Sequence, residues 1–101
     1  MPLTTIAKKS ELRPGEGKIA EAGGTSLAVF NVGGDFHVIE NTCCHRGGPL
    51  GEGDLDGTVV TCPWHGWRYD VTSGKCLAPN PAASVKSYRA TVEGDEVKVE
   101  I

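Results

Sequence analysis

Short runs in which apolar and polar residues alternate recur along this chain, and turn-forming residues separate them. In Phe36-His37-Val38, for example, two apolar residues flank a polar one, which is the two-residue period of a β-strand. Such runs predict a chain of short strands with almost no helix. The expected strands cover residues 3–7, 18–21, 26–32, 36–40, 58–61, 67–69, 85–93 and 96–101.

Dipeptides that contain glycine mark the expected turns. Gly23-Gly24, Gly33-Gly34 and Gly94-Asp95 supply the positive φ angles that tight hairpins require. We therefore expect an all-β fold with an antiparallel sandwich or barrel as its base, in which residues 85–101 form the final hairpin.

The segment 41–57 does not follow the alternating pattern. It is rich in glycine and poor in apolar residues, so we expect it to have little core of its own and to be held by something else, such as a metal cluster. Glu52, Asp54 and Asp56 lie in this segment and are interpreted as a solvated loop face rather than a carboxylate site.

Length and charge narrow the possible functions. The 101 residues fit one domain, residues 1–101, and the formal net charge of −3 offers no basic stripe for a nucleic acid. No run of about 20 apolar residues could span a bilayer, and the N-terminus lacks a signal-peptide pattern. We expect a cytoplasmic monomer with no membrane or nucleic-acid partner.

Two pairs of potential metal ligands dominate the chemistry of the chain. Cys43 and His45 form the first pair, and Cys62 and His65 form the second after a gap of sixteen residues. Each pair offers one sulfur and one nitrogen, on two loops that are expected to face each other. Two Cys and two His can hold a tetrahedral zinc ion, although zinc fingers usually pair Cys with Cys and His with His.

The residues around these pairs carry a more specific signal. His45-Arg46-Gly47 with Pro49-Leu50 follows the first pair, and the second lies in the run from Cys62 to Asp70, Cys-Pro-Trp-His-Gly-Trp-Arg-Tyr-Asp. Together with the ligand spacing, they resemble the Rieske iron–sulfur proteins, in which two Cys hold one iron and two His the other. The resemblance implies one [2Fe–2S] cluster per chain, in a two-loop cluster-binding lobe of about residues 41–72 inserted into the β base.

The resemblance also implies a function. Small Rieske ferredoxins carry single electrons from a flavin-containing NAD(P)H reductase to a terminal Rieske-type oxygenase and are not themselves enzymes. Oxygenase subunits add a catalytic iron held by two His and a carboxylate, whereas His37 is the only His here outside the ligand set. Two alternatives stay open: a small accessory subunit of an NADH-dependent nitrite reductase, and a zinc-stapled interaction module.

Further residues receive roles by the same resemblance. Arg46 and Gly48 surround the expected His-ligated tip, where a partner would dock. Trp64, between two ligands, is interpreted as packing over the cluster, with a place on the docking surface as the alternative. Trp67 is expected to be more buried than Trp64, and Tyr69 stands where relatives have a Tyr that bonds a ligand sulfur. Pro79 begins a proline-containing loop that resembles the one covering the cluster in this family. High-potential relatives have a disulfide where this chain has Gly48 and Trp64, so that bridge is absent.

The remaining cysteines and histidine receive simpler interpretations. Cys44 and Cys76 could form a disulfide, but small reduced side chains fit a cytoplasmic protein better. His37 belongs to the alternating strand 36–40 and is interpreted as a strand-face residue rather than a ligand.

Overall fold

The structure is a computed structural model, and it describes residues 3–42, 48–64, 66–78 and 81–100. Antiparallel strands make up most of it, as the sequence predicts, with two single turns of 3-10 helix. The strands are β1 (Leu3–Lys8), β2 (Gly17–Ala22), β3 (Thr25–Val32), β4 (Asp35–Glu40), β5 (Asp54–Asp56), β6 (Val59–Thr61), β7 (Arg68–Asp70), β8 (Cys76–Ala78), β9 (Ser87–Tyr88), β10 (Ala90–Glu93) and β11 (Glu96–Glu100). The helical turns are η1 (Lys9–Glu11) and η2 (Leu50–Glu52).

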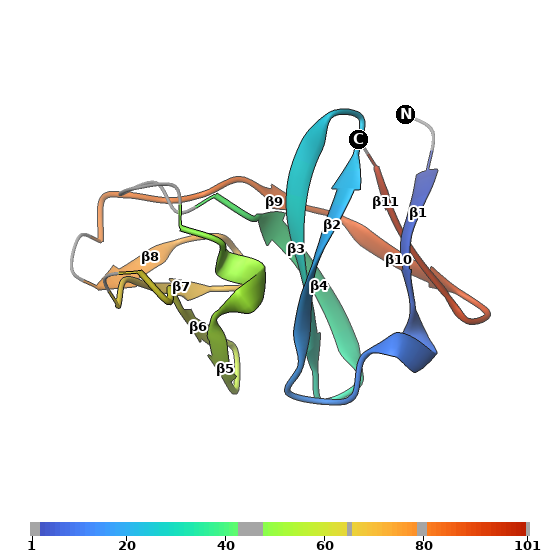
Figure 1. Ribbon diagram of the computed structural model, residues 1–101, viewed down its shortest axis with the longest axis horizontal. Helices are drawn as coiled ribbons and strands as arrows, with labels where there is room; N and C mark the ends of the chain where they lie inside the picture. Colours follow the sequence, from blue (N-terminus) through green and yellow to red (C-terminus); the bar gives the residue numbers. More distant parts are fainter. Residues whose placement is uncertain (1–2, 43–47, 65, 79–80, 101) are drawn as a thin grey trace.

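Two sheets form the base of the molecule (Figure 1). One has the strand order β1-β11-β10, and the other has the order β2-β3-β4-β9. The turn glycines behave as the sequence predicts, since Gly23, Gly24, Gly33, Gly34 and Gly94 all have positive φ. The base core lies between these sheets and consists of Ala7, Leu12, Ala22, Leu27, Val29, Phe36, Val38, Val97 and Val99.

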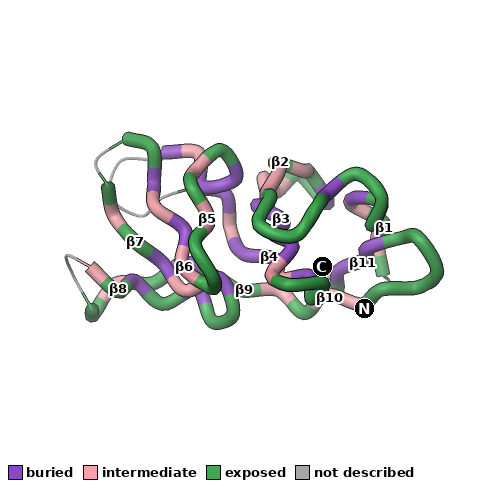
Figure 2. Tube along the Cα trace, turned by 90° about the horizontal axis from the view of Figure 1, so that it is seen from below, coloured by how far each residue is buried: buried purple, intermediate pink, exposed green. Residues whose placement is uncertain are grey.

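A third sheet, with the order β5-β6-β7-β8, lies at the other end of the molecule (Figure 1). It packs on a second core, here called the lobe core, that combines residues of the third sheet with residues of β3 and β4. The lobe core consists of Ala28, Phe30, Ile39, Leu50, Val60, Cys62, Tyr69, Val71, Cys76 and Val85. Figure 2 shows how buried positions continue from the base into this part of the chain.

β3 links the two cores because neighbouring side chains on a strand point to opposite faces. Leu27 and Val29 belong to the base core, while Ala28 and Phe30 belong to the lobe core, and none of the four is exposed to solvent. The apolar run in β3 is therefore explained by burial on both faces. Burial of β3 on both faces also fixes the third sheet against the base.

The prediction of one strand over residues 85–93 was wrong. β9 pairs with β4 in the second sheet, whereas β10 pairs with β11 in the first, so the chain changes sheets at Arg89. Val85 precedes β9 and is buried in the lobe core. The final hairpin of the base is accordingly β10–β11 alone.

Segment 41–57 was expected to have little core of its own, yet its described part contributes to the lobe core. Leu50, in η2, is fully buried in the lobe core, and β5 pairs with β6. Asp54 and Asp56 therefore lie on a strand rather than in a loop, although both side chains are exposed, as is Glu52. β8 is a second short strand that the sequence pattern did not indicate.

Neither helical turn in the described part of the chain is long and apolar enough to cross a membrane.

Candidate metal centre

The structure describes one of the four expected ligands, Cys62. Cys43, His45 and His65 lie outside the described residues, as do Arg46 and Pro79. Cys62 directly follows β6, is only 3% exposed and belongs to the lobe core. Its position at the end of a paired strand, within a packed core, gives its sulfur a fixed location.

Backbone hydrogen bonds close the loop that begins at Cys62. The Cys62 N–H donates to the Trp67 carbonyl (2.7 Å), and the Gly66 N–H donates to the Cys62 carbonyl (3.1 Å). Gly66 has a φ of 73°, which a residue with a side chain rarely adopts. The described ends of this loop are thus fixed where the chain leaves β6 and enters β7.

Asn41 holds the two ends of the other ligand segment together. Its side-chain oxygen accepts from the Gly51 N–H (2.7 Å), its carbonyl accepts from the Leu50 N–H (2.7 Å), and its Nδ2 donates to Ser26 Oγ (3.1 Å). Thr42 and Pro49 also form an isolated antiparallel bridge. The ends of the segment that carries Cys43 and His45 are therefore anchored to β3 and to η2.

This role of Asn41 was not predicted from the sequence. The residue is a buried polar side chain at the end of a buried strand, and buried amides usually have specific hydrogen-bond partners. That position is a weak signal in the sequence, because the partners lie fifteen and ten residues away.

Gly48 lies against both Cys62 and Trp64. A Cβ atom on Gly48 would be 2.6 Å from Cys62 Sγ, and 3.2 and 3.3 Å from Cγ and Cβ of Trp64. Because real Cβ atoms do not approach other heavy atoms this closely, only glycine fits here without a shift of its neighbours. The structure thus brings together three of the residues that the sequence singled out.

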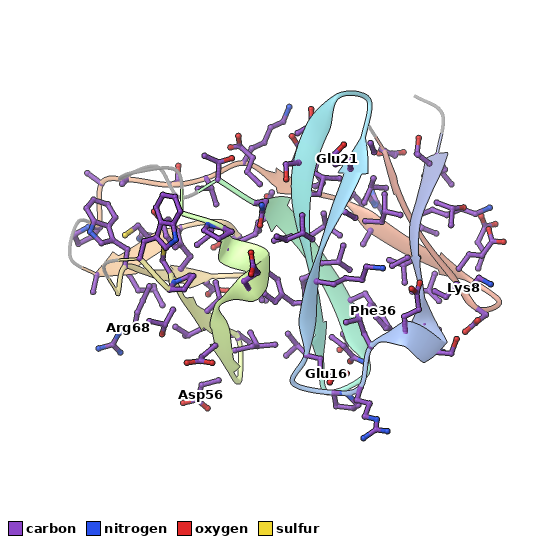
Figure 3. The ribbon with its side chains drawn as sticks, in the orientation of Figure 1. Lys8, Glu16, Glu21, Phe36, Asp56 and Arg68 are labelled. Atoms are coloured by element: carbon purple, nitrogen blue, oxygen red, sulfur yellow. The ribbon has the colours of Figure 1, made fainter. Side chains whose placement is uncertain are left out.

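Trp64, Trp67 and Tyr69 differ in burial along the same segment. Trp64 is 52% exposed, Trp67 is partly buried against the lobe core, and Tyr69 is fully buried between its strand partners Val60 and Cys76. Trp67 is thus more buried than Trp64, as expected, and Tyr69 is more buried than either. Arg68 and Asp56 extend outward from this part of the molecule (Figure 3).

Cys76 and His37 take no part in a metal site within the described residues. Cys76 is a free thiol, fully buried in the lobe core, and donates to the Ala78 carbonyl (3.3 Å). His37 lies on β4 opposite Phe30 and lines a hollow of about 380 Å³ with Tyr88 and Arg89. No group of three His, Cys, Asp or Glu in the described ranges could hold a metal ion.

The resolved pKa shifts lie on the base strands and their neighbours. Hydrogen bonds from the Lys8 N–H and the Lys18 ammonium lower the pKa of Glu11, and a hydrogen bond to Glu93 raises the pKa of Lys98. Burial, followed by the negative charge of Glu40, raises the pKa of Tyr88. These groups lie on η1, β11 and β9.

Comparison with protein families matches residues 3–89 to the Rieske [2Fe–2S] domain. Among curated proteins, the ferredoxin component of biphenyl 2,3-dioxygenase from Rhodococcus jostii strain RHA1 is 36% identical over 101 residues. That alignment covers 100% of this chain and 94% of the relative.

Solved structures give the same relationship. The ferredoxin of carbazole 1,9a-dioxygenase from Nocardioides aromaticivorans IC177 superposes with a TM-score of 0.92 at 27% identity, covering 98% of this chain and 97% of that one. A ferredoxin in complex with its oxygenase, also from a carbazole 1,9a-dioxygenase system, gives 0.87 at 32% identity, with 96% and 91% covered. A protein assigned as the NADH-dependent nitrite reductase small subunit of Mycobacterium tuberculosis gives 0.88 at 25% identity, with 97% and 93% covered.

Proposed function

Because this chain belongs to the Rieske [2Fe–2S] domain family, we propose that it is the ferredoxin component of an oxygenase system. In this role it accepts one electron from a flavin-containing NAD(P)H reductase and passes it to a terminal Rieske-type oxygenase. It carries electrons and is not itself a catalyst, like the ferredoxin components that it resembles. The observation that carries the proposal is the whole-length match to such a component.

The residues of the chain fit a [2Fe–2S] cluster. Cys43 and Cys62 would hold one iron and His45 and His65 the other, which is the donor set of this centre. Gly48 supports the fit, because a Cβ at this position would crowd Cys62 Sγ and displace the sulfur from its place. When bound, the cluster supplies a site for one electron.

The protein's own contribution is to keep the ligands in place. Outer contacts of this kind orient metal ligands and tune the site. Cys62 is held by the β6–β7 hydrogen bonds and by the lobe core, and Asn41 holds the ends of the other ligand segment. A frame that is already hydrogen-bonded lets the charge of the site change by one unit without rearranging the chain.

The docking face belongs to the same proposal. Trp64 is half-exposed beside the buried Gly48, and Arg46 follows the first His ligand directly. Transient redox contacts are small, often below about 1,200 Å² in total, so local shape and charge decide them. We infer that Arg46 and Trp64 form part of the surface that meets the oxygenase, and that Pro79 lies in a loop covering the cluster. Gly48, which the sequence also placed at the docking face, is buried and does not belong to that surface.

Metal analysis, spectroscopy and electron transfer test the proposal. Protein isolated under iron-replete conditions should contain two irons and two acid-labile sulfides per chain, and its visible absorption should bleach with dithionite. Stoichiometric zinc instead of iron would identify a zinc-stapled module and overturn the proposal. The reduced protein should then be oxidised by a Rieske oxygenase in stopped-flow experiments.

A second candidate function is that of a nitrite reductase small subunit, because such a protein shares the fold. Co-purification distinguishes the two functions. A stable complex with a nitrite reductase large subunit, and no electron transfer to an oxygenase, would favour this alternative. For the ferredoxin, we expect a cytoplasmic monomer that meets its partners transiently and binds neither membranes nor nucleic acids.

A further inference from the structure

The contact between Gly48 and Trp64 has a bearing on the sulfur of Cys62. Gly48 has no side chain, yet it is buried, so other residues must cover it. Trp64 is one of them, because its Cβ and Cγ lie beside the same point as Cys62 Sγ. Trp64 is 52% exposed, whereas Cys62 is only 3% exposed, so the tryptophan is the more accessible of the two neighbours of Gly48.

Water near this sulfur would favour the reduced state. An added electron makes the site more negative by one unit, and water stabilises the more highly charged state better than an apolar surface does. The apolar residues around a metal site thereby control its potential through solvent access. An apolar cover over Cys62 Sγ consequently disfavours reduction.

We propose that Trp64, packed on Gly48, is this cover, and that its indole lowers the reduction potential by keeping water away from Cys62 Sγ. The inference rests on the proposed function, because it takes Cys62 as a cluster ligand. In this role Trp64 acts on the cluster through Cys62, and its effect depends on the size and apolar character of its side chain. The absence of a side chain at Gly48 is what makes room for this packing.

Truncation of Trp64 tests the inference. Voltammetry of the iron-loaded protein should show a higher midpoint potential for Trp64→Ala, a smaller rise for Trp64→Leu, and a value near that of the original protein for Trp64→Phe. Val92→Ala removes a similarly exposed apolar side chain from β10 and should leave the potential unchanged. Equal potentials for the original protein and the Ala and Leu variants would overturn the proposal.

A second measurement detects water close to the cluster directly. Pulsed electron paramagnetic resonance of the reduced protein in D₂O should detect more exchangeable deuterons near the centre in Trp64→Leu than in Trp64→Phe. If Trp64→Ala does not retain iron, the Leu and Phe variants still decide the question. A protein that holds two irons and two sulfides but does not respond to Trp64 contradicts only this inference, whereas absence of the cluster from the original protein contradicts the proposed function.

Discussion

Gly48 is the residue at which the smallest change should have a large effect. In Gly48→Ala, the new Cβ would lie 2.6 Å from Cys62 Sγ, so the sulfur or the backbone must move. Overpacking of this kind typically costs about 1–3 kcal/mol. We expect the purified variant to hold much less iron per chain than the original protein, as measured by iron analysis.

A matched control for this prediction is Gly17→Ala. It crowds the Phe30 ring of the lobe core, where a Cβ would be 2.5 and 2.6 Å from two ring carbons. The substituted residue lies on β2, however, and the atoms nearest to its new Cβ belong to Phe30 and Val29 rather than to Cys62. This variant should lose stability and keep its iron. Full iron content in Gly48→Ala would show that Cys62 Sγ can move without loss of binding.

Two buried asparagines allow the effect on the metal site to be separated from the effect on stability. Asn41 bonds to Gly51 and Ser26 beside the ligand segment, whereas Asn31 bonds to Leu12 and Gly34 within the base. Substitution by Ala leaves buried partners without hydrogen bonds, which costs about 1–3 kcal/mol. Both variants should show a lower free energy of unfolding in urea.

Of the two variants, only Asn41→Ala should also lose iron faster to a chelator, because the Asn41 side chain helps to hold the segment with Cys43 and His45 and the Asn31 side chain does not. Equal rates of iron loss from the two variants would mean that stability, rather than the anchoring of this segment, controls retention of the metal.

At the scale of the elements, the turn between β7 and β8 should be sensitive to the residue at 74. Gly74 has a φ of 81°, and a Cβ there would collide with the Val85 carbonyl oxygen. The left-handed conformation alone costs a residue with a side chain roughly 1–2 kcal/mol. We therefore expect Gly74→Ala to lower the midpoint of thermal unfolding.

Gly57→Ala provides the control, since Gly57 also has a positive φ (63°) but has open space around its Cβ position. This variant should show the backbone cost without the collision. If the two variants unfold at the same temperature, the contact with Val85 contributes nothing to stability.

Elements with a local signal were predictable, and those that depend on distant contacts were not. The β2–β3–β4 hairpins follow from alternation and from Gly23-Gly24 and Gly33-Gly34, which are neighbours in sequence. β5 and β8 are as short as β6 and β7, which were predicted, but they contain no β-branched or aromatic residue to identify them as strands. The break at Arg89 has no local signal, because β9 and β10 differ only in the strands with which they pair.

The same distinction applies to the candidate site. Cys62, Gly48 and Trp64 could be selected from the spacing and flanking residues, and the structure brings them together. The anchoring by Asn41 could not be predicted, because its partners come from β3 and η2. Leu50 also contributes to a core that its glycine-rich surroundings did not indicate.

For the whole molecule, removal of the metal should leave the lobe core in place. That core includes Ala28, Phe30 and Ile39 from the base, so it does not depend on the cluster alone. Hydrogen exchange of the iron-free protein should still show slow amide exchange at Val60 and Tyr69, which pair in β6 and β7. Fast exchange at both would mean that metal binding supplies the folding energy of the third sheet.

Electron delivery should respond to charge at the expected docking face. Arg46→Glu should slow the oxidation of reduced protein by the oxygenase at low ionic strength, with a visible spectrum close to that of the original protein, because steering depends on complementary charge. Arg68→Glu makes the same change of charge on β7, at an exposed position (Figure 3), and should have the smaller effect. Stopped-flow experiments at several salt concentrations measure the oxidation rates of both variants. Equal rates for the two variants would move the docking face away from Arg46.

The pairing of β1 with β11 bears on how the protein is made in the cell. Leu3 lies opposite Glu100, so a strand synthesised early must wait for one synthesised almost a hundred residues later. Contacts this distant in sequence close slowly, because the chain loses much entropy in bringing them together. The β1-β11-β10 sheet therefore cannot form while the ribosome is still making the middle of the chain. β1 stays unpaired with β11 on the nascent polypeptide until β11 has emerged.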